Sequence, residues 1–381
     1  MFAPFILQWL TGSSSRPEGI SHRAPGVCFY KGCHSRTGYG MIPSKVIRCF
    51  IVALLLGAAS SAQLRQVAII DIPGQPGFDA LAFAGKYVVI AHTAANALDV
   101  FDPRLRRVVA RVNGLSAPRG LAVDEAAGRV YVANSGSNTI SIISTQDWKV
   151  HESIQLNTSP DSLLLVPEWQ ALCVGDWRQQ SVSLIKLDQS NQVSTAPIGG
   201  IPQRIVFDPR QNLIFVTTQG APDLVTLDRK PTVVHRYRLN GSQLTGLAFD
   251  PKDDRLYVAA RSAVLVVDPQ DGAEVARIVS PQSVNELWYD QNTRSIYAAA
   301  EDGSVTMIKA DAGRYLNQNE LHTQVKGHTL AFDASRQYVY MPGGREGRSK
   351  LVILKRVEPS AMTATASPEQ STSQQQVAQK H

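Results

Sequence analysis

The sequence predicts an all-β fold, a seven-bladed β-propeller whose four-stranded antiparallel blades form a ring closed by the N-terminal strand. Three observations support this prediction: a motif that recurs seven times, a strand-like alternation inside each repeat, and a last repeat that is one strand short. Repeats of about 40–50 residues that hold four strands and no helix are typical of propeller blades, which pack face to face around a channel.

The repeat is visible in two independent registers. An apolar triplet recurs at intervals of 40 to 43 residues and ends at Phe83, Val123, Val166, Phe207, Phe249, Tyr289 and Phe332. A second series follows each triplet at similar intervals, at Val89, Tyr131, Cys173, Phe215, Tyr257, Tyr297 and Tyr340. Since both series count seven units, the sequence predicts seven blades.

Each repeat has the periodicity of strands. In the second repeat, residues 129–134, 139–143 and 149–154 are β-branched or alternate between apolar and polar side chains. Turn-forming residues such as Gly128, Asn138 and Asp147 separate these runs. Short β-branched runs between turn formers predict strands, and no run with a helical period competes with them.

The two ends of the repeat region complement each other. The last repeat supplies only three strands, over 329–333, 337–341 and 350–355. The segment Gln66–Ile72 precedes the first repeat and resembles an outermost strand. We expect it to pair with the last blade, because closing the ring removes open sheet edges that would otherwise favour aggregation.

Outside the propeller, at 63–358, the chain has three further parts. Lys45 and Arg48 precede an apolar run over 49–59 that ends in the small residues Ser60, Ser61 and Ala62. This pattern predicts a signal peptide over 41–62, cleaved after Ala62, with an uncleaved anchor as the alternative. Residues 1–40 are interpreted as a gene-start artefact or a disordered leader, and the polar segment 359–381 as a disordered tail.

Removal of residues 1–62 on export would change both the net charge and the cysteine content of the chain. Of the formal net charge of +6, residues 1–62 carry +5, so the mature chain is close to neutral. Near neutrality and the lack of a basic run disfavour nucleic-acid binding. We expect a periplasmic or secreted monomer with no transmembrane span in the mature chain. Three of the four cysteines precede Ala62, and the fourth, Cys173, occupies the position of Tyr131, which predicts a buried side chain without a disulfide.

The second repeat resembles a known family. Residues 129–143 read RVYVANSGSNTISII, and their YVAN segment is similar to the signature of the YVTN β-propeller repeat family. Other repeats depart further from it, but Phe207-Asp208-Pro209 and Phe249-Asp250-Pro251 also look like that family. The resemblance covers roughly residues 66–357 and implies an exported propeller. Because propellers carry many unrelated activities, it says little about function.

In propellers, ligands bind at the channel mouth, which is formed by loops before the first strand and between the second and third strands of each blade. Aligning the repeats assigns Asp79, Arg119, Asp161, Gln203, Arg204, Thr245, Asn285, Glu286 and His328 to the first group of loops. The second group contains His92, Asn134, Asp176, Trp177, Thr218, Gln219, Arg261, Glu301, Asp302 and Arg345.

These residues leave two functions open. The first is a non-catalytic binding scaffold that uses the channel mouth and ring face; its partner would be an unidentified protein, a peptidoglycan fragment or a small anion, because guanidinium groups bind carboxylates and phosphates well. The second is a metal-dependent, lactonase-like hydrolase with its site in the channel, for which His92, Asp176, Glu301 and His328 are the candidate ligands. No cofactor is expected, since the mature chain lacks a haem, Walker or nucleophile-elbow motif.

Overall fold

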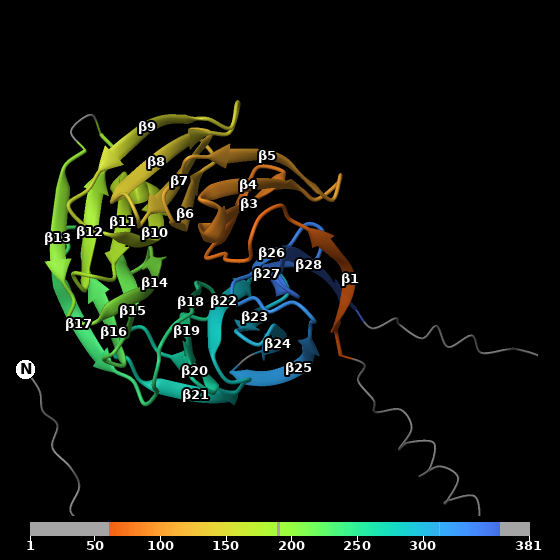
Figure 1. The fold of residues 1–381 in the computed structure, drawn as a ribbon. Helices are drawn as coiled ribbons and strands as arrows, with labels where there is room; N and C mark the ends of the chain where they lie inside the picture. Colours follow the sequence, from red (N-terminus) through yellow and green to blue (C-terminus); the bar gives the residue numbers. More distant parts are fainter. Residues whose placement is uncertain (1–60, 189–190, 312, 359–381) are drawn as a thin grey trace, which may run out of the picture. The chain divides into compact units, whose positions relative to one another are not determined.

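The computed structural model describes residues 61–188, 191–311 and 313–358, which form seven four-stranded antiparallel sheets arranged in a ring (Figure 1). This confirms the predicted propeller. Two 3₁₀ turns, η1 (Thr93–Ala95) and η2 (Pro167–Trp169), are the helical elements of the described residues. None of the helices in this part of the chain has the length and apolar character needed to cross a bilayer. The expected leader, the apolar run of the signal peptide and the tail lie outside the described residues.

The blades follow one another along the chain. Blade 1 contains β2 (Leu81–Ala84), β3 (Tyr87–His92), β4 (Ala97–Asp102) and β5 (Arg107–Asn113). Blade 2 contains β6 (Pro118–Asp124), β7 (Arg129–Asn134), β8 (Thr139–Ser144) and β9 (Val150–Gln155). Blade 3 contains β10 (Pro160–Val166), β11 (Ala171–Asp176), β12 (Ser181–Lys186) and β13 (Val193–Pro197). Blades 4 and 5 contain β14 (Ile201–Asp208), β15 (Leu213–Gln219), β16 (Asp223–Leu227), β17 (Val233–Arg238); and β18 (Leu247–Asp250), β19 (Arg255–Ala260), β20 (Ala263–Val267), β21 (Glu274–Val279). Blade 6 contains β22 (Val284–Asp290), β23 (Ser295–Ala300), β24 (Ser304–Asp311), β25 (Arg314–His322), and blade 7 contains β26 (Ala331–Asp333), β27 (Tyr338–Arg345), β28 (Arg348–Val357).

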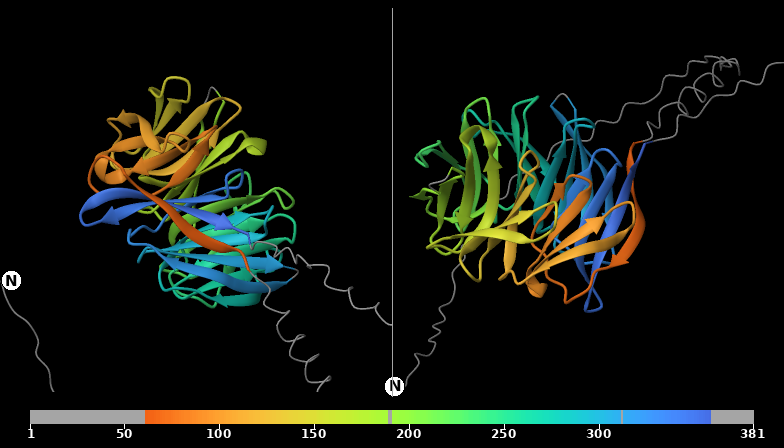
Figure 2. Two further views of the ribbon diagram at one scale, coloured as in Figure 1. Left: turned by 90° about the vertical axis from the view of Figure 1, so that its right-hand side faces the viewer. Right: turned by 90° about the horizontal axis from the view of Figure 1, so that it is seen from above.

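The ring closes as predicted. The strand β1 (Gln63–Asp71) pairs antiparallel with β28, from Gln63 opposite Val357 to Asp71 opposite Lys350. The last sheet therefore has the order β1-β28-β27-β26, with the N-terminal strand outermost. Figure 2 shows β1 lying along β28, the first and last strands of the ring. The predicted closing segment began at Gln66, three residues after the observed start of β1. Residues 63–65 lack a strong strand pattern in the sequence, and only their pairing with residues 355–357 of β28 shows that they belong to the strand.

The interfaces between blades hold the core. The second repeated series lies on the second strand of each blade, and all seven side chains are at most 1% exposed. Tyr297 of blade 6, for example, stacks on Phe332 of blade 7 with ring centroids 4.2 Å apart. Fully burying a large apolar side chain contributes about 1.5–3 kcal/mol relative to exposing it. These repeated positions therefore hold the ring together.

Cys173 belongs to the same series and is buried, as its position predicts. Burial raises the pKa of its thiol well above the usual range. Because the thiolate is the reactive form, this side chain packs as a small apolar group.

The Asp-Pro pairs noticed in the sequence end inner strands. Oδ1 of Asp250, the last residue of β18, accepts hydrogen bonds from the backbone N–H groups of Lys252 (2.9 Å) and Asp253 (3.2 Å). Asp208 accepts one from Arg210 in the same way, at 2.8 Å. Such side-chain-to-backbone bonds stabilise tight turns, and proline presets the backbone angle that follows. These aspartates are therefore structural.

One repeat register differs from the sequence alignment. In blade 2, Leu121 lies opposite Val132, and the residue with the equivalent pairing in blade 3 is Leu163, opposite Val174. The sequence alignment had begun that triplet at Leu164. Apolar residues from Leu163 to Val166 make the two registers indistinguishable by hydrophobicity, and the pairing of β10 with β11 decides between them.

Candidate functional site

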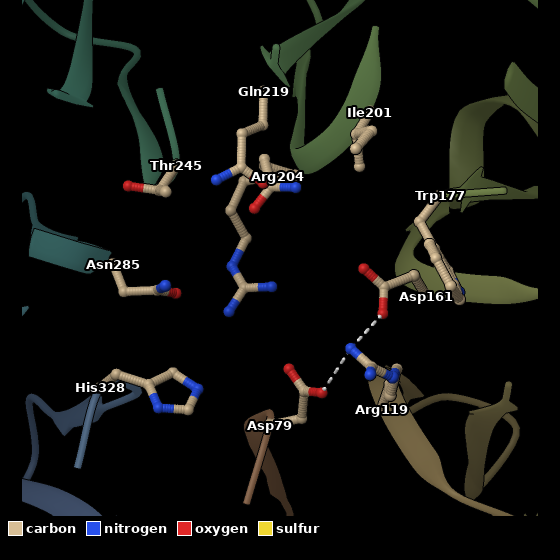
Figure 3. A pocket seen from close by; sticks show the side chains of 11 residues that line it. Asp79, Arg119, Asp161, Trp177, Ile201, Arg204, Gln219, Thr245, Asn285 and His328 are labelled. Carbon is tan, nitrogen blue, oxygen red and sulfur yellow. Dashed lines mark hydrogen bonds and ion pairs between the residues drawn. The ribbon is translucent and has the colours of Figure 1, made fainter. Parts of the chain in front are cut away.

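A cavity of about 470 Å³ opens at one end of the central channel (Figure 3). Each blade contributes to its wall the residue two positions before the inner-strand leucine or isoleucine. These seven residues are Asp79, Arg119, Asp161, Gln203, Thr245, Asn285 and His328. We call them the rim. All seven belong to the first group of loop residues that the sequence alignment assigned to the channel mouth, and Arg204, Trp177, Ile201 and Gln219 complete the lining.

Two glycines allow the inner strands to come close enough to form this wall. A Cβ atom on Gly120 would lie 2.3 Å from the backbone oxygen of Asp161 in the next blade. A Cβ atom on Gly246 would lie 2.9 Å from the backbone nitrogen of Leu287. Real Cβ atoms do not approach backbone atoms this closely, so only glycine fits at these two positions. The spacing of the rim residues depends on them.

On one side of the cavity, one guanidinium is shared by two carboxylates. Nη1 of Arg119 lies 3.0 Å from Oδ1 of Asp161 and 3.2 Å from Oδ2 of Asp79 (Figure 3). The three residues come from consecutive blades. Burial and repulsion from Asp79 raise the pKa of Asp161, while Arg119 and Arg204 oppose that shift. This side of the cavity therefore carries one more negative than positive charge.

A second arginine forms the inner boundary of the cavity. Nε of Arg204 donates to both carboxylate oxygens of Glu286, at 3.1 and 3.0 Å, and Nη2 also contacts Oε2. The pair spans from blade 4 to blade 6. Burial lowers the pKa of Arg204, but Glu286, Asp79 and Asp161 together raise it above its usual value, so the guanidinium stays charged. Arg204 also lines a smaller cavity of about 130 Å³ with Glu286, so the pair separates the two spaces.

The remaining rim groups are uncharged hydrogen-bonding side chains or imidazole. Asn285 and His328 line the side of the cavity away from Arg119, and Figure 3 shows the Asn285 amide and the His328 ring directed toward the centre. Gln203 lines the cavity from blade 4, next to the blade of Asp161. The Thr245 hydroxyl donates to the backbone oxygen of Val284 at 2.6 Å. A ligand in the cavity would thus meet a charged wall on one side and a neutral polar wall on the other.

The residues of the second group of loops lie in different surroundings: some line the cavity, some an adjoining pocket, and others are buried within blades. Trp177 and Gln219 line the cavity. Arg261 and Glu301 line an adjoining pocket of about 210 Å³ that shares Gln203 and Asn285 with it. Within the described residues, no ion pair joins Arg261 to an acid.

His92 is enclosed within blade 1 and is fully buried. Its Nδ1 lies 2.7 Å from Oδ2 of Asp99, and its Nε2 lies 2.7 Å from the backbone oxygen of Gln75. Asp99 also accepts from Arg111. Both ring nitrogens are occupied, so His92 ties the segment after β1 to blade 1.

Asn134 and Asp176 are also buried and have structural partners. The Asn134 amide donates to Oγ of Ser141 at 2.8 Å, inside blade 2. Oδ1 of Asp176 accepts from the backbone N–H groups of Arg178 and Gln179. These two side chains shape strand ends rather than line the cavity.

The four residues considered as metal ligands are found in different surroundings. His92 and Asp176 are buried inside blades, Glu301 lines the adjoining pocket and His328 lines the rim. Over residues 61–188, 191–311 and 313–358, no group of three or more His, Cys, Asp or Glu side chains is placed to hold a metal ion.

The arginines behind the expectation of an anionic ligand have acidic partners in three of four cases. Arg119 contacts Asp79 and Asp161, Arg204 contacts Glu286, and Arg345 lies 3.6 Å from Glu346 on blade 7. The sequence could not show these pairings, because each of the first two joins different blades.

Comparison with known proteins bears on the fold. No protein-family model matches the chain, and no curated protein matches it. Among solved structures, a chain of hydrazine synthase from Kuenenia stuttgartiensis superposes with a TM-score of 0.64 and 12% sequence identity, over 76% of this chain and 97% of that one. At this identity the likeness establishes a shared architecture, and the chain is therefore a seven-bladed β-propeller.

Proposed function

We propose that this protein is an exported, non-catalytic binding protein whose channel-mouth cavity holds a small polar ligand. One observation carries the proposal: seven equivalent rim positions converge on one cavity, yet hold side chains of five chemical kinds. A purely structural role would be met by similar residues at equivalent positions, as it is between the blades. The volume lies within the usual range of about 300–1,000 Å³ for ligand pockets.

Export is proposed from the sequence. The basic start, the apolar run and the small residues before Gln63 support cleavage after Ala62. The YVTN-like pattern of the second repeat supports the same assignment, since that family is exported.

The lactonase-like hydrolase has less support. Its four candidate ligands are distributed over two buried blade positions, the rim and the adjoining pocket. A site of that kind requires its ligands to converge on one ion. The rim, by contrast, offers hydrogen-bonding groups around one space, which is what a binding site for a polar ligand requires.

The test combines export with binding. The full chain is produced with its own leader in a Gram-negative host, and the protein is purified from the periplasm. We expect its N-terminal residue to be Gln63. The purified protein is then titrated calorimetrically with a panel of monosaccharides, amino acids and dicarboxylates.

At least one class of the panel should bind, and Asn285→Trp should abolish binding by filling the cavity. Leu316→Trp is the matched control, because Leu316 is 64% exposed on the outer strand β25 and should leave binding unchanged. Retention of the protein in the cytoplasm would refute export. Equal binding by the Asn285→Trp variant would show that the ligand lies elsewhere.

A further inference from the structure

We propose that the rim cavity selects a ligand that carries an ammonium group, held beside Asp79 and Asp161, together with hydroxyl groups that face the neutral wall. This inference rests on the proposed binding function and names the chemical class of its ligand.

The charged side chains around the cavity leave an excess of negative charge. Five side chains with a full charge line the cavity or pair directly with those that do, namely Asp79, Arg119, Asp161, Arg204 and Glu286. The rim also holds one titratable imidazole, that of His328, on the blade next to that of Asp79. Arg204 and Glu286 neutralise each other. Arg119 neutralises only one of its two carboxylate partners, so the excess negative charge lies between Asp79 and Asp161. Arg178 is exposed on the loop beside Trp177, where solvent screens it.

This excess negative charge lies in partly buried surroundings. The Asp161 side chain is 19% exposed and Asp79 26%. Burial and the nearby Asp79 raise the pKa of Asp161, which means that Arg119 and Arg204 together do not fully stabilise its ionised form. A ligand ammonium would stabilise it. A ligand anion would instead meet the same excess negative charge and two arginines that already have partners.

The other side chains of the cavity wall suit a cation that also carries hydroxyl groups. Trp177 borders Asp161 in the cavity and is 39% exposed (Figure 3). The face of an indole ring attracts cations, and Arg178 already lies over this ring, 5.1 Å from its centroid. Gln203, on the blade next to that of Asp161, and Asn285, across the cavity in Figure 3, offer amide donors and acceptors suited to hydroxyl groups. An amino sugar combines both features.

The experiment uses three sugars that share one ring and differ in charge. Glucosamine carries an ammonium group, glucose is neutral and glucuronate is an anion. Binding to the exported, purified protein is measured calorimetrically at low ionic strength and pH 6.5, where an amine of this kind is protonated. We expect glucosamine to bind about 10-fold more tightly than glucose, the effect of one charge-assisted contact, and glucuronate to bind more weakly than either.

Variants locate the effect. Asp161→Asn and Asp79→Asn each retain the side-chain shape and should weaken glucosamine binding about 10-fold, while glucose binding changes less than about two-fold. Asp147→Asn is the control, because Asp147 pairs with His151 at the exposed end of blade 2 and should have no effect. Thermal unfolding checks that each variant folds. If a variant does not fold, the affinities of the unmodified protein for the three sugars still test the inference.

The pH dependence gives an independent measurement. Because ammonium binding favours ionised Asp161, glucosamine affinity should fall as the pH decreases through the pKa of Asp161, which burial and Asp79 raise above its ordinary value. Glucose affinity should stay constant over that range. Asp161→Asn should remove the dependence at that pH.

Equal affinities for the three sugars, or tightest binding of glucuronate, would overturn the inference. If Asn285→Trp abolished binding in either case, the binding function of the cavity would remain. If none of the three sugars bound, the amino-sugar class would be wrong, and the wider panel described above would decide separately whether the cavity binds any ligand.

Discussion

Between the blades, seven side chains at one repeated position are all buried and all apolar or aromatic, whereas the seven rim residues at another repeated position include two carboxylates, a guanidinium, two amides, a hydroxyl and an imidazole. Both sets come from the same repeats, one residue per blade. The first set packs against neighbouring sheets, so each member meets the same requirement. The second set faces a shared space, so its members can differ without disturbing the sheets.

The residue that follows each rim residue forms a second ring of the channel wall, in which two charged side chains differ from five small or hydroxyl-bearing ones. Its seven residues are Ala80, Gly120, Ser162, Arg204, Gly246, Glu286 and Thr329. Five are small or carry a hydroxyl, and the two charged ones pair with each other. Gly246 lies between them in the order of the blades. A channel wall that is mostly small residues is thus interrupted by one ion pair, which separates the two cavities.

The largest effect is expected from breaking ring closure. Deletion of residues 63–71 removes β1 and leaves β28 as an open edge, so the protein should unfold or aggregate. Size-exclusion chromatography and thermal unfolding measure the outcome. Arg65→Ala, at an exposed position of the same strand, should behave like the unmodified protein. A deletion variant that stayed monomeric with an unchanged melting temperature would show that closure does not depend on β1.

An intermediate effect separates the two repeated positions on one strand. Phe215 and Gln219 both lie on β15, the first fully buried between blades and the second on the cavity wall. Phe215→Ala should lower the free energy of unfolding by about 3–5 kcal/mol, since it leaves a cavity in the core. Gln219→Ala should change it by less than about 0.5 kcal/mol. Denaturant unfolding curves of the two variants provide the comparison, and similar losses would contradict it.

The smallest effect concerns the ion pair in the channel. Glu286→Gln leaves the Arg204 guanidinium, which is 24% exposed, without its counter-charge. We expect a loss of about 1–2 kcal/mol, smaller than for a fully buried pair because solvent reaches the arginine. The double variant Arg204→Met with Glu286→Met should recover most of that loss. A double-mutant cycle of Arg204→Met, Glu286→Met and the double variant, from denaturant unfolding, measures the coupling, and additive effects would show that the pair contributes no stability.

Two histidines illustrate how far the site could be predicted. His92 and His328 are both polar residues next to strands, and the sequence assigned both to the channel mouth. His328 lines the rim, whereas His92 is buried against Asp99 and the backbone of Gln75. Gln75 belongs to the segment that follows the closing strand, so the surroundings of His92 exist only after the ring has closed.

The arginines show the same limit. Repeat alignment was sufficient to assign Arg119 and Arg204 to the mouth, because a register position determines the level of a residue in its blade. It could not show that Asp79 and Asp161 flank Arg119, or that Glu286 lies across the channel from Arg204. Those distances depend on the angle between blades.

The sequence by itself determined the number of blades, the four-stranded repeat, the closing segment and the burial of Cys173. These properties follow from local alternation and from repetition, which are written along the chain. Only the tertiary structure decided which charges meet, because Asp79, Arg119 and Asp161 come from three separate blades and contact one another only when closure of the ring brings those blades around a common axis.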